Sequence, residues 1–145
     1  MENMISNISN REKRKLCEVC GERRARTLCP RCHRLICNNC LDPVWHYCID
    51  CASVKRVLQD DYKRYLDRVN SLLEDIKKRL SYNMCLECPI LRELLFSYIK
   101  NLKDLENIAR KEDYHYIMDE IKQTKGTAQR LAIIICTKLL GNLKS

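Results

Sequence analysis

Residues 17–51 read CEVCGERRARTLCPRCHRLICNNCLDPVWHYCIDC, and the rest of the chain is interpreted from this stretch. It holds eight of the eleven cysteines, arranged as four Cys-x-x-Cys pairs: Cys17/Cys20, Cys29/Cys32, Cys37/Cys40 and Cys48/Cys51. A Cys-x-x-Cys turn brings two sulfurs to about 2.3 Å from one metal ion, so two such turns complete a tetrahedral zinc site. Four turns therefore predict two structural zinc sites, each closed by four cysteine ligands.

The spacing alone leaves two ways to divide the pairs between two ions. In the interleaved order, the first and third pairs share one ion, and the second and fourth pairs share the other. In the sequential order, neighbouring pairs share an ion. His46 is an alternative ligand in place of Cys48, although Cys48-x-x-Cys51 matches the other pairs.

The composition indicates a globular and mainly helical protein. The chain has 145 residues, 46% hydrophobic and 32% charged, with only three glycines and three prolines. The polar N-terminus lacks the apolar core of a signal peptide. The longest apolar run, 131–136, is far short of the ~20 residues of a membrane helix. We expect a soluble, intracellular protein, and in that compartment such cysteines more often bind metal than form disulfides.

The formal charge of +8 overstates the positive charge of a metal-loaded protein. Eight thiolates and two zinc dications together carry about −4, which leaves about +4. Most of the positive excess lies in residues 11–56, which hold eleven Lys/Arg against five Asp/Glu. This range covers the basic part of a predicted flexible tail, residues 1–16, and the cysteine stretch, where all five basic residues are arginines. Arginine suits specific contacts with carboxylates or phosphates. The candidate partner-binding residues are Lys13, Arg14, Lys15, Arg23, Arg24, Arg26, Arg31 and Arg34.

Residues 53–145 show helical periodicity. Apolar residues recur at alternating four- and three-residue spacing from Leu58 to Ile76 and again from Leu91 to Ala109. Gly126 is read as a break between two further helices, and Cys136 as a buried residue. The sequence predicts an antiparallel bundle with helices at about 54–80, 89–110, 113–125 and 127–140. We expect a monomer; a coiled-coil dimer through the first helix is the alternative.

The cysteine stretch resembles the B-box and the related HIT-type zinc fingers. Cys29-Pro-Arg-Cys32 and the four-residue gap before Cys37 carry the resemblance, which covers residues 17–51, about a quarter of the chain. The predicted double zinc module spans residues 17–52. In both families the cysteine pairs bind two zinc ions in the interleaved order. The resemblance therefore implies one ion held by Cys17, Cys20, Cys37 and Cys40, and a second held by Cys29, Cys32, Cys48 and Cys51. A RING module fits these loop lengths poorly.

A fifth pair, Cys85 and Cys88, precedes Pro89. No βαβ pattern surrounds it, so we expect a local disulfide or two packed thiols rather than a redox site. The sequence contains no phosphate-binding loop and no nucleophile motif, and zinc held by four thiolates has no open position for a substrate. These features predict a protein that is not an enzyme.

The cysteine head, the helices that follow and the total length together resemble the RNA polymerase inhibitory proteins of archaeal viruses. The resemblance implies a protein in the host cytoplasm that occupies the DNA-binding channel of RNA polymerase and blocks transcription initiation. One alternative is a DNA-binding regulator that uses its arginines on phosphates. Another is a scaffold similar to tripartite-motif proteins, in which a B-box precedes helices.

Overall fold

The computed structural model describes residues 15–82 and 86–144. The candidate residues Lys13, Arg14 and Cys85 lie outside them, as does most of the predicted tail. The chain divides into two compact units, Met1–Leu58 and Gln59–Ser145. The described part of the first unit, residues 15–58, is called the head below, and the second is called the helical unit.

The head contains little regular structure. Strands β1 (Thr27–Leu28) and β2 (Leu35–Ile36) pair antiparallel, with Thr27 opposite Ile36, and a 3-10 turn, η1, covers Asn38–Cys40. The buried core of the head consists of Ile36 and five cysteines. Besides Ile36, only partly buried side chains such as Val19, Leu41 and Tyr47 pack against this cluster. So little apolar burial cannot offset the chain entropy of so many ordered residues, so the cysteines must contribute more than apolar burial.

Helix α2 (Ile49–Arg79) begins earlier than the predicted residue 54. The N–H of Ala52 donates to the carbonyl of Cys48 at 2.9 Å, so the fourth cysteine pair forms the first helical turn. Asp50 lies in that turn, where a carboxylate is favoured by the helix dipole. The sequence reading placed the helix after the last cysteine because it treated the four pairs as equivalent loops.

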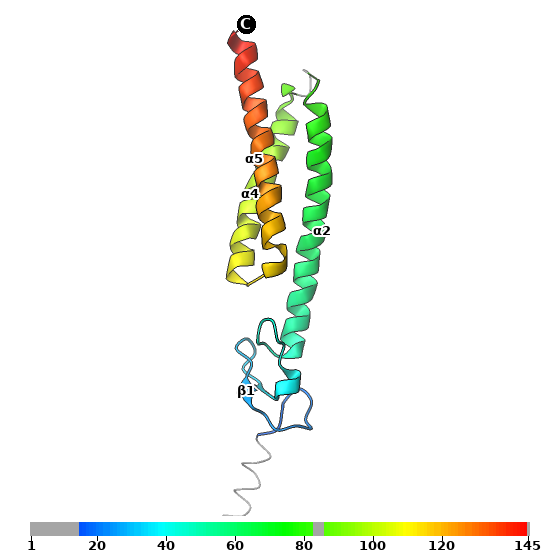
Figure 1. Ribbon diagram of the computed structural model, residues 1–145, viewed down its shortest axis with the longest axis vertical. Coiled ribbons are helices and arrows are strands. Elements are labelled where there is room, and N and C mark those ends of the chain that lie inside the picture. Colours follow the sequence, from blue (N-terminus) through cyan, green and yellow to red (C-terminus); the bar gives the residue numbers. More distant parts are fainter. Residues whose placement is uncertain (1–14, 83–85, 145) are drawn as a thin grey trace, which may run out of the picture. The chain divides into compact units, whose positions relative to one another are not determined.

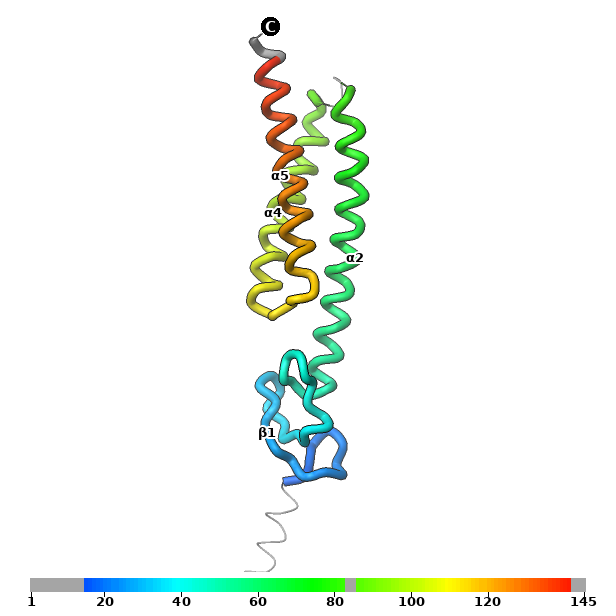
Figure 2. Tube along the Cα trace, in the orientation of Figure 1, coloured from blue at the N-terminus to red at the C-terminus, as the bar shows by residue number. Residues whose placement is uncertain are grey.

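The helical unit contains three helices among its described residues: the larger part of α2, then α4 (Pro89–Lys111) and α5 (His115–Lys144). The chain reverses direction twice, so α4 runs antiparallel to both neighbours (Figures 1 and 2). Helices α4 and α5 pack against each other. Each helix turns an apolar face inward. The buried residues include Leu66, Val69, Leu73 and Ile76 of α2, Leu95, Leu102, Leu105 and Ala109 of α4, and Ile117, Ile121, Ala128, Leu131 and Ile135 of α5.

The predicted helix break at Gly126 is wrong, because α5 is one continuous helix through this residue. Thr127, read as a cap for a fourth helix, instead donates from its hydroxyl to the carbonyl of Gln123 at 3.1 Å, inside the helix. Glycine costs only ~1 kcal/mol relative to alanine in a helix interior. Burial of Ile121, Ala128 and Leu131 on one continuous face outweighs that cost.

Polar contacts fix the three helices of this unit to one another. Lys63 of α2 pairs with Glu120 of α5 at 2.6 Å, and the Thr124 hydroxyl donates to the Asn70 side-chain oxygen at 3.0 Å. Between α4 and α5, Lys125 pairs with the buried carboxylate of Glu106. Such contacts specify which helix faces meet, while apolar burial supplies most of the stability.

The outer surface of the helical unit differs from the sequence prediction in one respect. Cys136 is exposed, not buried, because it lies beside Ile135 on α5 and only the latter faces the core.

None of the helices in residues 15–82 and 86–144 combines the length and apolar character needed to cross a membrane.

Candidate metal centres

The first two cysteine pairs form matching tight turns. The N–H of Gly21 donates to the carbonyl of Cys17 and the N–H of His33 to that of Cys29, both at 2.8 Å. Gly21 and His33 each follow the second cysteine of a pair and both adopt positive φ, +68° and +62°. Glycine adopts this conformation without strain, whereas histidine at this position is held there by the turn.

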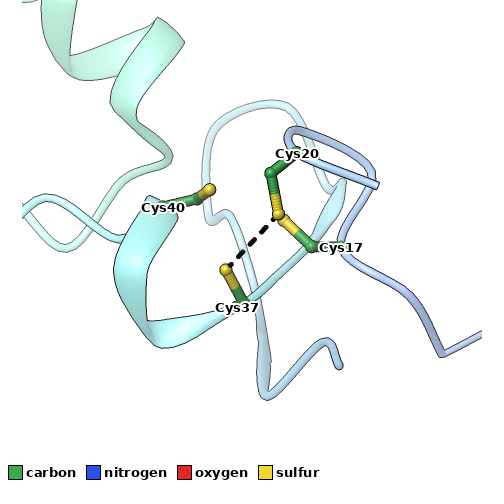
Figure 3. A group of neighbouring side chains, drawn as sticks. All are labelled: Cys17, Cys20, Cys37 and Cys40. Carbon is green, nitrogen blue, oxygen red and sulfur yellow. Dashed lines mark hydrogen bonds between the residues drawn. The ribbon is translucent and has the colours of Figure 1, made fainter. Parts of the chain in front are cut away.

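The structure brings the first and third pairs together. The sulfurs of Cys17, Cys20, Cys37 and Cys40 lie within 4.8 Å of one another and are called centre 1 (Figure 3). Cys17 and Cys20 come from the first turn, while Cys37 directly precedes the 3-10 turn η1 and Cys40 is its last residue. Three of the four are buried, and Cys20 is half-buried.

The second and fourth pairs form a separate group. The sulfurs of Cys29, Cys32, Cys48 and Cys51, called centre 2, also lie within 4.8 Å of one another. The two centres therefore follow the interleaved order. Cys32 is exposed and Cys51 half-buried, so centre 2 is more open to solvent than centre 1. His46 is exposed and belongs to neither group.

The sulfur separations fit a tetrahedral metal ion. Two ligands at 2.3 Å from one ion, at the tetrahedral angle, lie about 3.8 Å apart. Cys20 Sγ lies 3.9 Å from Cys37 Sγ, and Cys32 Sγ lies 3.8 Å from Cys48 Sγ. A disulfide would require about 2.05 Å. Each centre is therefore suited to one metal ion with four thiolate ligands.

The protonation of these thiols also favours a cation. Burial raises the pKa of Cys17, but backbone N–H groups of Cys20, Cys37 and Val19 lower it to about 6. The pKa of Cys29 likewise falls to about 6. Burial and the three neighbouring sulfurs raise the pKa of Cys40 and that of Cys51 to about 12. Some thiolates in each centre form readily, whereas the full set of four needs a positive ion between them.

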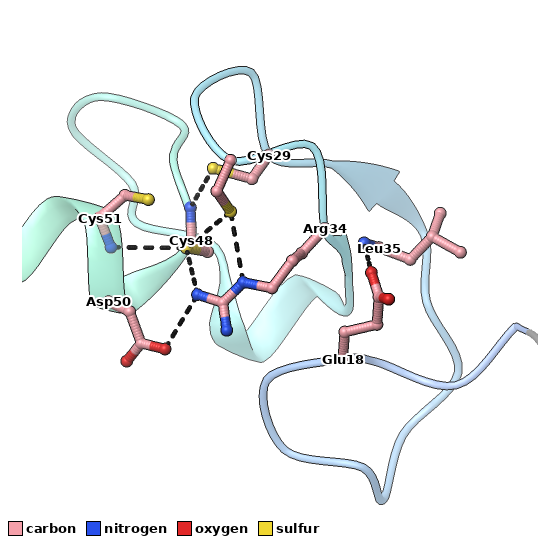
Figure 4. A network of polar contacts seen from close by, with 8 residues as sticks. Glu18, Cys29, Arg34, Leu35, Cys48, Asp50 and Cys51 are labelled. Atoms are coloured by element: carbon pink, nitrogen blue, oxygen red, sulfur yellow. Dashed lines mark hydrogen bonds and ion pairs between the residues drawn. The ribbon is translucent and has the colours of Figure 1, made fainter.

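Arg34, predicted to contact a partner, is used inside the head. Its Nε donates to the sulfur of Cys32 and its Nη2 to that of Cys48, both at 3.3 Å (Figure 4). The same Nη2 pairs with Asp50 at 3.0 Å. The Cys32 sulfur, then Asp50 and the Cys48 sulfur, raise the pKa of the guanidinium. The one feature of the sequence that could have indicated this contact with the sulfurs is the position of Arg34, two residues after Cys32.

The remaining described candidates stay on the surface. Lys15, Arg23, Arg24, Arg26 and Arg31 are all exposed. The Arg31 guanidinium lies 5.9 Å from the centre of the Tyr47 ring.

The comparisons with known proteins return nothing for this chain: neither a family model, nor a curated protein, nor a solved structure matches.

A braced loop between the third and fourth pairs was missed in the sequence. The buried carboxylate of Asp42 accepts the N–H groups of Val44 and Trp45 at 3.0 and 2.9 Å, and pairs with Arg56. The ammonium of Lys55 lies 5.2 Å from the Trp45 ring centre and 4.8 Å from that of Tyr47. Asp42-Pro43 is a turn signal that could have identified this loop.

Proposed function

We propose that the head binds two zinc ions, one in centre 1 and one in centre 2, and that these ions hold it folded. The observation that carries this is the gathering of eight sulfurs into two sets of four, each within 4.8 Å of one another. A set of four thiolates selects zinc or iron, and an isolated tetrahedral ion with interlocking turns is typical of structural zinc. Zinc-loaded protein is colourless, whereas an iron-loaded centre absorbs visible light, so elemental analysis with a spectrum separates the two.

A zinc ion surrounded by four thiolates has no open coordination position. The proposed role of the ions is therefore to hold a recognition surface, and the protein is proposed to be a binding module and not an enzyme. Exposed Arg23, Arg24 and Arg26 lie on the loop between the first two turns. Since turns closed by metal position this loop, its guanidinium groups are pre-ordered for carboxylates or phosphates of a partner.

The proposed partner is RNA polymerase, and the proposed effect is to block transcription initiation from within the DNA-binding channel. The partner rests on the resemblance of the cysteine pattern, the helices and the chain length to polymerase inhibitory proteins of archaeal viruses. The charges are compatible with it. A channel that binds DNA is positively lined, and the helices carry exposed carboxylates, which include Asp60, Asp61, Glu74 and Asp75.

The test combines three measurements on the full, zinc-loaded chain. Purified archaeal RNA polymerase should be retained by the immobilised protein without DNA, and promoter-dependent transcription should fall as the protein is added. A gel shift with DNA alone should show no complex at physiological salt. Polymerase that is not retained, together with a DNA shift that weakens steeply with salt, would support the DNA-binding regulator instead. Failure of both would favour a scaffold.

Charge reversal separates the two candidate surfaces. Arg24→Glu with Arg26→Glu tests the head, and Asp60→Lys with Asp61→Lys tests the helices. Lys100→Glu, at an exposed position of α4, is the control. Loss of polymerase retention in either pair but not in the control locates the contact.

A further inference from the structure

The two centres have unequal surroundings. The sulfurs of Cys17 and Cys20 in centre 1 accept hydrogen bonds from backbone N–H groups of neighbouring residues. Centre 2 has backbone donors as well: the N–H of Cys48 donates to Cys29 Sγ at 3.3 Å, and that of Cys51 donates to Cys48 Sγ at 3.4 Å. To these, Arg34 adds a charged side-chain donor to two sulfurs at once (Figure 4).

We propose that Arg34 is a positioning residue for the second zinc ion, and that centre 2 depends on this guanidinium for its affinity while centre 1 does not. The inference rests on the proposed zinc binding. It assigns to Arg34 a metal-holding role in place of the partner contact expected from the sequence.

Electrostatics gives the first reason. Four thiolates around a zinc dication leave a net charge of about −2, which is costly where solvent cannot fully reach it. Cys29 and Cys48 are completely buried, so solvent screens only the Cys32 side of the centre. A guanidinium 3.3 Å from the sulfurs of Cys32 and Cys48 offsets part of this charge at short range.

Shape gives the second reason. The sulfurs of Cys32 and Cys48 lie 3.8 Å apart, and two N–H groups of one planar guanidinium reach both. The guanidinium therefore fixes the separation of these two sulfurs, which belong to two different cysteine pairs. A lysine ammonium carries the same charge but is a point donor on a flexible stem, so it cannot reproduce this two-point contact.

Asp50 orients the guanidinium of Arg34. Its carboxylate accepts from Arg34 Nη2 at 3.0 Å, yet its own side chain is 62% exposed. Water screens most of the Asp50 charge, so the carboxylate holds the guanidinium without cancelling its effect on the sulfurs. Asp50 lies between Cys48 and Cys51 in the first turn of α2, which links the orientation of Arg34 to the helix start.

The test measures the affinity of each centre separately. Removal of a residue that orients metal ligands typically costs 10- to 100-fold in metal affinity. Arg34→Ala should lower the affinity of centre 2 by this factor, and Arg34→Lys should recover only part of it. Arg26→Ala, which removes an exposed arginine elsewhere in the head, is the control and should leave both centres unchanged.

Competition with a chelator gives the two affinities, and cadmium NMR of the full chain assigns them. The two cadmium signals are identified by their couplings to cysteine β-protons. In the wild-type protein, the signal of centre 2 should also couple to the Arg34 Nε proton across the N–H···S hydrogen bond. Cobalt-loaded Arg34→Ala should show a shifted sulfur-to-cobalt absorption band.

The outcomes separate this inference from the proposed zinc binding. Fewer than two ions per wild-type chain would refute the zinc proposal itself. If the wild-type chain binds two ions, two results would overturn the role of Arg34 alone. One is that Arg34→Ala and Arg26→Ala have the same metal affinity at centre 2, and the other is that Arg34→Ala weakens both centres equally. If Arg34→Ala does not fold, the wild-type coupling decides: its presence supports the role of Arg34, and its absence overturns it.

Discussion

The sulfur of Cys20 lies 3.9 Å from that of Cys37, a residue seventeen positions further along the chain. This separation is that of two ligands on one tetrahedral ion, and it joins the first cysteine pair to the third across the second. The head is thus closed by two crossed loops. A metal ion that closes such loops removes much of the entropy of the open chain.

The interleaved order can be tested by double substitution. Cys17→Ser with Cys37→Ser removes two ligands from centre 1, so this variant should retain one ion. Cys17→Ser with Cys29→Ser removes one ligand from each centre and should weaken both. Native mass spectrometry of each variant counts the ions. Sequential pairing gives the reverse result, with both ions weakened in the first variant and one ion retained in the second.

Chelation should unfold the head and leave the helices. Structural zinc contributes about 10–16 kcal/mol in small fingers, and Ile36 is the one large aliphatic side chain buried with the cysteines of the described head. Trp45, the single tryptophan, reports on the head through its fluorescence. A chelator should shift that fluorescence and expose the head to proteases, while most helical circular dichroism remains. An unchanged protease pattern after complete metal removal would contradict the proposed role of the ions.

The helical unit should lose stability in acid through Glu106. A hydrogen bond from Lys125 lowers the pKa of this carboxyl below its ordinary 4.5, against the opposing effect of burial. A lowered folded pKa stabilises the fold above about pH 4.5, and the contribution is lost as the pH falls through the folded value.

Glu106→Gln should therefore cost about 1–3 kcal/mol of unfolding free energy at pH 7 and progressively less below pH 4.5. Denaturant unfolding followed by circular dichroism measures this. Glu93→Gln, at an exposed position of the same helix, is the control. A difference that stays constant from neutral to acid pH would show that the ionised pair is not responsible.

The two structural glycines should respond in opposite ways to alanine. At Gly126, an added Cβ would meet only the flexible end of Arg130 at 3.4 Å, so Gly126→Ala should stabilise α5 by about 0.5–1 kcal/mol. At Gly21, with φ +68°, Gly21→Ala should destabilise the head by ~1 kcal/mol. Destabilisation by Gly126→Ala would mean that the helix is broken at this residue, as the sequence predicted.

The local features of the fold could be predicted from the sequence. Contacts between residues far apart in the sequence could not. Cysteine spacing fixes tight turns, and apolar periodicity locates the inward faces of helices, because both depend on neighbours in sequence. The role of Arg34 depends on sulfurs that tertiary structure brings near, and its residue type alone suggested a surface contact. Gly126 shows the same limit: local propensity indicated a break, and burial on both sides overrode it.

The loop braced by Asp42 was missed for a related reason. Its buried carboxylate pairs with Arg56, which lies fourteen residues further along the chain on α2. The Asp-Pro signal was visible, but the partner of the carboxylate lies beyond the fourth cysteine pair, and only the folded head brings the two residues together.

The most direct test of the account is the metal content of the full chain purified with zinc. Native mass spectrometry, combined with alkylation of free thiols, should find two zinc ions per chain, with the eight cysteines of residues 17–51 protected until a chelator is added. A chain that holds no zinc, or whose eight thiols react at once while it remains folded, would contradict it.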